Sequence, residues 1–293
     1  MIISIVIVNY NGGRMVIDTI DSVVHSMDSL KYEVIVVDNA SSDGSHEAIK
    51  KTFGEQVLFV EMGRNAGFAA ANNAGVKKAS GKYILFLNPD TIVLPNAIQT
   101  LVNYMESHPD VGACGGNLYN IKHEPNFSYW MLLPGWKMEM HSLLSNVLLQ
   151  LHYHGSHQHN LTNQPKDVGY IMGADLMVTR EVIDKVGCFD EDFFLFYEET
   201  ELCNRIHKAG YKIMNIPAAH IIHLEGQTID KMNIRLQQMM SSRAKYMRKC
   251  CSAPERHLAN SILVISSILR IGWFALCGNR DKVNFWKYTL THI

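Results

Sequence analysis

The chain has 293 residues, of which 47% are hydrophobic and 19% charged, a composition that excludes disordered, collagen-like and disulfide-scaffold proteins. At about 150 residues per domain, this length corresponds to one large or two small domains. The net charge is −1, but residues 231–293 carry 11 basic and 2 acidic side chains, against 16 and 26 in residues 1–230. This asymmetry predicts that the tail meets an anionic surface, either nucleic acid or phospholipid.

In the first half of the chain, short β-rich runs alternate with segments of helical length. We expect strands at 2–8, 33–37, 57–61 and 83–87, and helices at 15–27, 45–53, 67–78 and 95–108. Near-continuous apolar runs of this kind are typical of parallel strands buried on both faces. The alternation therefore predicts βαβ units around a mostly parallel sheet, which is an α/β fold.

The alternation fades after Cys114, and residues 119–167 give no clear pattern. Regular structure is expected again over 168–178, in helices at 180–186 and up to 209, and in a strand at 212–216. The histidines at 152, 154, 157 and 159 lack Cys or carboxylate partners, so we interpret them as part of an exposed loop rather than a zinc site.

The tail begins with a predicted helix at 231–249, followed by a break at 252–255 that contains Pro254. The most apolar segment of the chain, 258–277, comes next and has Arg270 inside it. Because a central arginine costs a spanning helix about 3 kcal/mol, we expect this segment to lie in a membrane interface. A helix pair packed on the rest of the protein is the alternative.

The cysteines and the first residues of the chain bear on its compartment. The six cysteines form no CxxC pair and no metal-type spacing, and the start of the chain lacks the charged region and cleavage site of a signal peptide. We therefore expect the protein in a reducing cytoplasm.

A polar turn follows each of the first four predicted strands. These turns are NYNGG at 9–13, DNASSDGS at 38–45, GRNAG at 63–67 and NPD at 88–90. Since ligands of parallel sheets bind beyond the carboxyl ends of the strands, the turns predict a single site. The chain has neither GxGxxG after the first strand nor a Walker loop, so a nucleotide would have to be held by carboxylates and a metal.

Six motifs stand in the order of a known family: VIVNYNGG, VVDNASSDGS, GRNAGFAAANNAG, LFLNPDT, FDEDFFLFYEETELCNR and HLEGQT. Together, over about residues 3–228, they resemble glycosyltransferase family 2. The resemblance implies a GT-A fold with a Rossmann-like sheet, a nucleotide-sugar donor and a divalent metal. The RNAGFAAANN and HLEGQT variants are most similar to bacterial rhamnosyltransferases and related enzymes that build surface polysaccharide.

The resemblance also implies which residues bind the donor. Tyr10 would stack on the nucleotide base and Asp38 would accept its imide hydrogen, which suits uracil or thymine. The full implied set is Asn9, Tyr10, Asp38, Asn39, Asp43, Arg64, Asn65, Gly67, Asn72, Asn88 and Asp90. Turn chemistry is the alternative for the loop residues, and Asn72 and Asn73 could equally be solvated helix residues.

By the same resemblance, Asp90 and His223 are the metal ligands. Asp90 matches the last carboxylate of the family's DxD motif, whose first position is Asn88 here. His223 matches the histidine that completes the site, with His220 as a competitor and a core histidine as the alternative. A carboxylate and an imidazole suit magnesium or manganese.

Glu198 and Glu199 occupy the position of the family's acidic pair. An inverting transfer needs one carboxylate to take the proton of the acceptor hydroxyl as it attacks the anomeric carbon, and Glu199 is our candidate, although the family usually has Asp there. Gly173 and Asp175 fall in the acceptor-side loop, where Asp175 could bond an acceptor hydroxyl. Favourable acidic charge at a helix N-terminus is the alternative for the glutamates.

We expect a GT-A domain at 1–230, with a nucleotide-binding half (1–117) and an acceptor-side half (118–230), and a helical extension at 231–293. The expected function is inverting transfer of a sugar, with rhamnose as a candidate, from a dTDP- or UDP-linked donor to a lipid-linked or surface-polysaccharide acceptor. The extension would hold this cytoplasmic protein on the anionic inner face of the cell membrane, with no nucleic-acid partner. The alternatives are a catalytically degenerate binding module and a GT-A enzyme of different stereochemistry.

Overall fold

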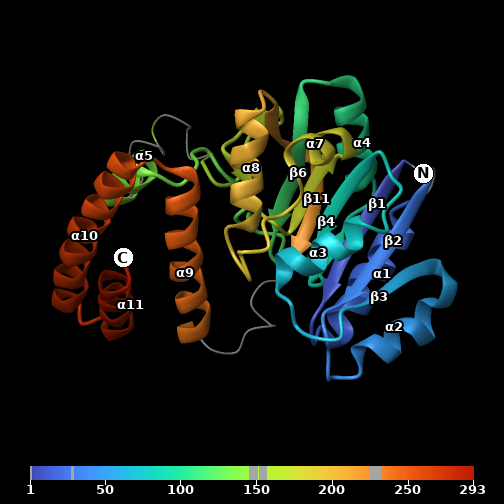
Figure 1. The fold of residues 1–293 in the computed structure, drawn as a ribbon, viewed down its shortest axis with the longest axis horizontal. Helices are drawn as coiled ribbons and strands as arrows, with labels where there is room; N and C mark the ends of the chain where they lie inside the picture. Colours follow the sequence, from blue (N-terminus) through green and yellow to red (C-terminus); the bar gives the residue numbers. More distant parts are fainter. Residues whose placement is uncertain (1, 28–29, 145–150, 152–156, 225–231) are drawn as a thin grey trace.

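The computed structural model describes residues 2–27, 30–144, 151, 157–224 and 232–293. Its centre is a nine-stranded sheet in the order β3-β2-β1-β4-β10-β6-β11-β5, with β8 paired to β11. A two-stranded sheet joins β7 to β9. Figure 1 shows helices on both sides of the large sheet and three C-terminal helices beside it.

The apolar runs of the first half form the parallel part of the sheet. It contains β1 (Ile3–Asn9), β2 (Tyr32–Asp38), β3 (Val57–Glu61) and β4 (Tyr83–Leu87). One face is covered by α1 (Gly13–His25), α2 (Ser45–Phe53) and α4 (Ala97–Ser107). The other is covered by α3 (Phe68–Val76), α7 (Arg180–Val186) and α8 (Glu198–Lys208). The predicted α/β fold is confirmed, because β1, β2 and β4 are buried on both faces.

The second half of the chain completes the sheet, mainly with antiparallel strand pairs. Its strands are β5 (Thr91–Val93), β6 (Val111–Tyr119), β10 (Asp175–Thr179) and β11 (Lys212–His223). β10 runs antiparallel to both β4 and β6, and β11 runs parallel to β6. The predicted strand at 212–216 is too short. The chain passes Pro217, which cannot donate to the ladder, through a register shift between Ile216 and His220 and then resumes pairing.

Within 119–167 the described residues contain short elements and two buried histidines. The elements are β7 (Tyr129–Trp130), α5 (Trp136–Leu143) and β8 (Lys166–Asp167), and β9 (Tyr170–Ile171) follows. The exposed-loop interpretation is wrong for His157 and His159, which are buried. His159 contacts the Asn117 amide at 3.2 Å and the Asn126 carbonyl at 3.0 Å. His152 and His154 lie outside the described residues.

Three helices form the C-terminal extension: α9 (Met232–Cys250), α10 (Ala253–Leu276) and α11 (Arg280–Thr291). A break is present, but it is shorter than the predicted 252–255, because α10 already begins at Ala253: Ser252 caps it through a reciprocal capping box with Glu255, and Pro254 lies in the first turn. Among the described helices, α10 is long and apolar enough to cross a membrane, a property that buried helices of soluble proteins share. All six cysteines are free thiols.

Candidate active site

Asn9 joins the polar turns after β1 and β2. It lies opposite Asp38 in the parallel register, and its amide nitrogen donates to Asp38 Oδ1 at 2.9 Å and to Ser45 Oγ at 2.8 Å. The Asn9 Oδ1 atom accepts the backbone N–H of Gly12 at 3.2 Å. Asn9 and Asp38 are both buried, so Asn9 fixes the position of the predicted base-binding carboxylate.

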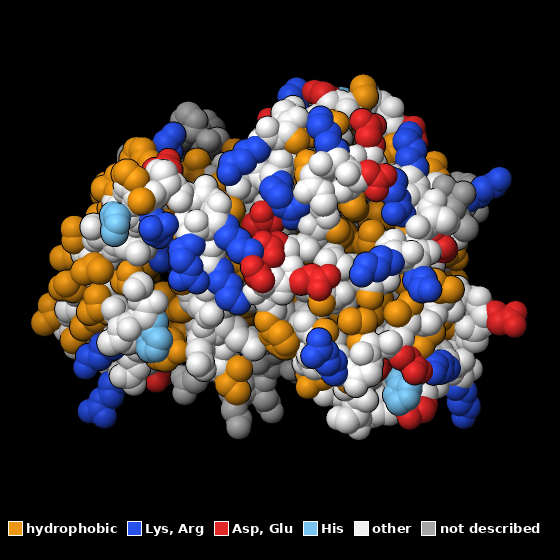
Figure 2. Space-filling model, in the orientation of Figure 1, with side chains coloured by type: hydrophobic (Ala, Val, Ile, Leu, Met, Phe, Trp, Pro, Cys, Tyr) orange, Lys and Arg blue, Asp and Glu red, His pale blue; other side chains and the backbone are white. Residues whose placement is uncertain are grey.

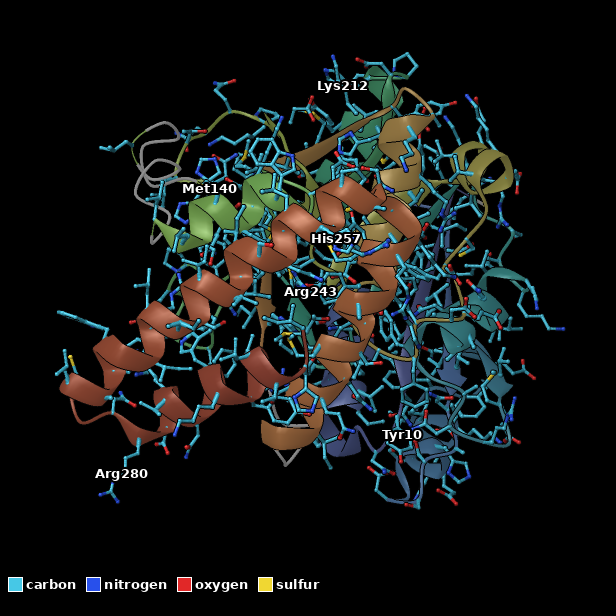
Figure 3. All side chains as sticks on the ribbon, turned by 60° about the vertical axis from the view of Figure 1, so that its left-hand side comes forward. Tyr10, Met140, Lys212, Arg243, His257 and Arg280 are labelled. Carbon is cyan, nitrogen blue, oxygen red and sulfur yellow. The ribbon has the colours of Figure 1, made fainter. Side chains whose placement is uncertain are left out.

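Tyr10 and Asp43 flank this buried pair. The Tyr10 side chain is 40% exposed, at the edge of the α/β body away from α10 and α11 (Figure 3), where a base could stack on it. Asp43 accepts the N–H of Gly13 at 2.9 Å and the N–H of Ser45 at 3.0 Å. Although partial burial raises the pKa of Asp43, hydrogen bonds from Ser45 and Gly13 hold it below its ordinary value. Asp43 therefore braces the two turns, and its donor contact stays a prediction.

The turn after β3 is tied to the turn after β2 by paired amides. Asn39 donates to Asn65 Oδ1 and accepts the N–H of Ala66, both at 2.9 Å. Gly67 follows with φ +90°, and a Cβ there would lie 2.6 Å from the Phe194 carbonyl oxygen. Glycine suits this position because any other residue would place a Cβ against Phe194 and would rarely adopt this backbone conformation. The neighbouring Arg64 is exposed.

Asn72 and Asn73 are not the solvated helix residues of our alternative. Asn72 is 1% exposed and donates to the Phe68 carbonyl one turn earlier. Asn73 donates to the Phe189 carbonyl at 2.9 Å and accepts the Phe189 N–H at 3.1 Å. Asn73 thus anchors the start of the acidic and aromatic run, while the predicted donor contact of Asn72 stays a prediction.

Asp90 and His223 meet because β5 pairs with the end of β11. Thr91 lies opposite His223 in that register, and Asp90 Oδ1 lies 3.3 Å from His223 Nε2. Two ligands at right angles around one Mg²⁺ or Mn²⁺, with bonds of about 2.1 Å, lie about 3 Å apart, so the pair fits a shared cation. Asn88 Nδ2 lies 3.4 Å from the same His223 nitrogen. The competitor His220 packs against the ring of Tyr119.

The protein offers few ligands for such a cation. Within the described ranges, no group of three or more His, Cys, Asp and Glu side chains could hold a metal ion. Because Mg²⁺ and Mn²⁺ commonly take further ligands from water and from phosphate oxygens, a carboxylate and an imidazole are compatible with a cation that binds together with a diphosphate.

Thr19 of α1 supports the NPD turn and was missed by the sequence analysis. Its hydroxyl donates to the carbonyl oxygens of Pro89 and Thr91, at 2.9 and 2.7 Å, and accepts the N–H of Thr91 at 3.1 Å. The signal was present, since Thr19 is a polar residue on the buried face of α1, between Val16 and Val23.

Glu198 and Glu199 begin α8, and both side chains are buried. Neither Oε2 atom has a hydrogen-bond partner in the described part of the chain. Burial raises the pKa of Glu199 to about 7, and burial together with the charge of Glu199 raises the pKa of Glu198 well above its ordinary value. Two buried carboxyl groups with raised pKa values are suited to general acid or base chemistry.

Gly173 and Ala174 connect this carboxyl pair to the NPD turn. The Ala174 carbonyl accepts the N–H of Asn88 at 3.0 Å, and a Cβ on Gly173 would lie 3.7 Å from the Cβ of Glu199. Asp175 is fully buried instead, and its Oδ2 accepts the Gly116 N–H at 2.5 Å. Its acceptor role stays a prediction.

The two residues before Glu198 have a strained backbone. Phe196 and Tyr197 have φ values of +69° and +71°, in the left-handed region that residues with a side chain rarely adopt. Each such residue costs about 1–3 kcal/mol and persists only where the surroundings fix it. This left-handed backbone determines the direction in which the chain enters α8, and hence the position of Glu198 and Glu199.

Comparison with known proteins places these features in a family. The model of "Glycosyl transferase family 2" matches residues 4–187. The N-acetylglucosaminyl-diphospho-decaprenol L-rhamnosyltransferase of Mycobacterium tuberculosis is 26% identical over 210 residues, which are 65% of this chain and 66% of that protein. The poly-β-1,6-N-acetyl-D-glucosamine synthase of Staphylococcus aureus is 27% identical over 216 residues, 72% of this chain and 48% of that protein. The chain thus spans two thirds or less of these relatives.

Solved structures share the fold. A mannosyltransferase from Pyrobaculum calidifontis, in complex with GDP-mannose and Mn²⁺, superposes with a TM-score of 0.64 at 17% identity, over 99% of this chain and 85% of that one. GalNAc-T7 with UDP, GalNAc and Mn²⁺ gives a TM-score of 0.61 at 18% identity, over 85% of this chain and 48% of that one. At such low sequence identities the structural similarity shows the fold alone. It confirms the expected GT-A architecture.

Proposed function

Because the chain belongs to glycosyl transferase family 2, we propose that it transfers a sugar from a nucleoside diphosphate donor to a saccharide acceptor, with inversion at the anomeric carbon. The observation that carries this proposal is the position of Glu199. Its buried carboxyl group, with a pKa of about 7, lies against Gly173, and the next residue, Ala174, is bonded to the NPD turn. A candidate base and a candidate donor site thus share one short segment.

The donor would bind across the turns after β1, β2 and β3. Tyr10 offers an exposed ring for the base, and Asp38 is held in place by Asn9. An aromatic ring and a carboxylate suit thymine or uracil, so dTDP- and UDP-linked sugars are the candidates. The name of the mycobacterial relative supports rhamnose as the sugar, and that of the staphylococcal relative makes N-acetylglucosamine the competitor.

Asp90 and His223 would hold a divalent metal, magnesium or manganese. Their 3.3 Å separation supports this assignment, as do the two Mn²⁺-bound structures that share the fold. When bound, such a cation offsets negative charge on the diphosphate. Thr19 would keep the NPD turn in the conformation that presents Asp90.

Glu199 would act as the general base. Its carboxylate takes the proton of the acceptor hydroxyl while the hydroxyl oxygen bonds to the anomeric carbon and the bond from that carbon to the diphosphate breaks. A base with a pKa near 7 is deprotonated in about half of the molecules at neutral pH and is still basic enough to accept a proton, which is favourable for this step. A single attack from the face opposite the leaving group inverts the anomeric centre.

The acceptor would be a saccharide on a polyprenyl diphosphate, and the extension would place the protein on the anionic inner face of the membrane. The outward face of α10 supports this. Ile268 is 55%, Leu269 60% and Trp273 63% exposed, whereas Ser266 and Ser267 are buried. The buried face also holds Ala259, Ile262 and Leu263, so apolar side chains lie on both faces of α10, whereas the outward face of a soluble helix is polar. Figure 2 shows the hydrophobic side chains gathered over α10. Basic residues of α11, each worth about 1 kcal/mol near an anionic surface, follow at 280, 282 and 287.

Nucleotide binding tests the donor site. We expect dTDP or UDP with Mn²⁺ to raise the melting temperature of the purified protein, because a ligand at 100 times its Kd stabilises the folded state by about 2.7 kcal/mol. Asp90→Ala should remove the Mn²⁺-dependent part of the shift, and Glu106→Gln, an exposed carboxylate on α4, should retain it. No shift with any nucleotide at saturating concentration would contradict the proposal.

Sedimentation with vesicles tests the membrane contact. Wild-type protein should co-sediment with vesicles that contain 30% phosphatidylglycerol, and Ile268→Glu with Leu269→Glu should abolish this. Leu58→Glu, which changes an exposed apolar residue of β3, is the matched control. Equal sedimentation of the α10 variant and the wild type would exclude the outward face of α10 as the contact.

A further inference from the structure

The segment 189–197, which leads into the catalytic pair, is anchored first to the donor side of the site. The Phe194 carbonyl accepts the N–H of Phe68 at 2.7 Å, and Gly67, which has no Cβ, allows Phe194 to approach. At its start, Phe189 is bonded in both directions to the side chain of Asn73. One face of the segment thus rests on α3 and on the turn after β3.

The other face of the segment is held by α9, at two positions about two turns apart on that helix. Ser242 Oγ donates to the Leu195 carbonyl at 2.8 Å. Two turns later, Lys249 Nζ lies 2.5 Å from a carboxylate oxygen of Asp190 and 2.5 Å from one of Asp192. Figure 1 shows α9 running alongside α8 and this segment.

Packing between these anchors is aromatic and tight. Phe193 is fully buried in a small cluster with Tyr246 and Met247 of α9. The ring of Tyr246 lies 5.6 Å from the ring of Tyr197, one of the two residues with a left-handed backbone. Strained conformations need surroundings that fix them, and on this face α9 supplies them.

α9 is in turn fastened to the rest of the extension. The guanidinium of Arg243 donates to Glu139 of α5 at 2.8 Å and to Asn260 of α10 at 3.1 Å. Figure 3 shows Arg243 beside α9, in the angle between α9 and α10. The helix that carries the apolar outward face and the segment that precedes the candidate base are therefore connected through α9.

We infer that α9 sets the position of the catalytic carboxylates, with Ser242 and Lys249 as positioning residues for Glu199. The C-terminal extension then takes part in turnover, in addition to any contact with a membrane. This inference rests on the role proposed for Glu199. A misplacement of about 1 Å can lower a rate by about 100-fold, so loss of these contacts should appear in kcat.

The test compares full-length wild type with the double variant Ser242→Ala, Lys249→Met. Ser242→Ala, Lys249→Arg restores the ion pairs, and Lys51→Met makes the same chemical change on the exposed surface of α2. Release of nucleoside diphosphate from dTDP-rhamnose and UDP-N-acetylglucosamine is measured with Mn²⁺ and a detergent-solubilised polyprenyl-diphosphate-linked N-acetylglucosamine as acceptor, without membranes. Hydrogen exchange of the peptide 189–197 is measured on the same proteins.

We expect the double variant to lose about tenfold or more in kcat, with its donor KM within about twofold of wild type, because the contact of Phe194 with Gly67 is unchanged. The arginine variant should recover part of the loss, and Lys51→Met should match wild type. Exchange over 189–197 should be about tenfold faster in the double variant.

A double variant with the kcat of the wild type would overturn the inference. So would a donor KM that rises by the same factor as kcat falls, because it would indicate that the donor site is disturbed as well. If the wild type consumed neither donor, the proposed function would be at fault, and exchange alone would decide. Unchanged exchange over 189–197 would then overturn the positioning role, and faster exchange would support it.

Discussion

Replacing Glu199 by Gln should stabilise the protein at alkaline pH and abolish its activity. Burial raises the pKa of Glu199 from an ordinary 4.5 to about 7, so the folded state binds this proton more tightly than the unfolded state does. The contribution of Glu199 to stability is therefore fully present below pH 4.5 and is lost as the pH rises to 7. Between these two pKa values the loss amounts to about 3 kcal/mol. Glutamine never ionises and escapes this loss.

Thermal unfolding at two pH values measures the effect. At pH 5 Glu199→Gln and wild type should melt within about 2 °C of each other. At pH 8 the variant should melt higher by up to about 6–12 °C, given about 2–4 °C per kcal/mol. Over the same range the wild-type rate should rise with pH and level off above about 7, because the base must be ionised. A gap in melting temperature that does not grow with pH would refute the reasoning.

Three further variants test the supports of the site. Gly67→Ala should lower the free energy of unfolding by about 3 kcal/mol in urea, because its Cβ meets the Phe194 carbonyl at 2.6 Å in a backbone conformation reserved for glycine; a loss below 1 kcal/mol would contradict this. Thr19→Val, which leaves the Thr91 N–H without its acceptor, should cost about 1–3 kcal/mol and weaken Mn²⁺-dependent nucleotide binding, and normal binding would exclude the proposed support of the NPD turn. Arg243→Met should cost about 3 kcal/mol by leaving Glu139 unpaired, with Arg243→Lys less affected, and equal losses would argue against a directional ion pair.

The parallel half of the fold could be predicted because its local and global signals agree. The strands at 57–61 and 83–87 and the helix at 45–53 end where the structure ends them, since apolar runs and polar turns alternate sharply there. The end of β11 could not be predicted, because pairing with β5 and β6 overrides the break that Pro217 signals. The described short strands within 119–167 could not be predicted for a related reason, since their pairing depends on contacts with residues distant in the sequence.

The candidate site shows the same limit at the level of side chains. The meeting of Asp90 with His223, 133 positions later, follows from the β5–β11 register, which no local pattern encodes. The left-handed backbone of Phe196 and Tyr197 could not be predicted either, because this conformation is common only for Gly, Asn and Asp. Packing of a helix pair on the rest of the protein was the alternative to a membrane contact, but no pattern in the sequence identified 189–197 as the segment on which α9 packs.

Transfer of a labelled sugar to lipid tests the central claim most directly. Wild type and Glu199→Gln would each be incubated with Mn²⁺, a polyprenyl-diphosphate-linked N-acetylglucosamine, and radiolabelled dTDP-rhamnose or UDP-N-acetylglucosamine, and the label in the lipid phase counted. We predict that wild type labels the lipid from one donor and that Glu199→Gln does so at least 100-fold more slowly, as expected for loss of a general base. Labelling by Glu199→Gln at the wild-type rate would contradict the assignment of Glu199 as the base on which this account depends.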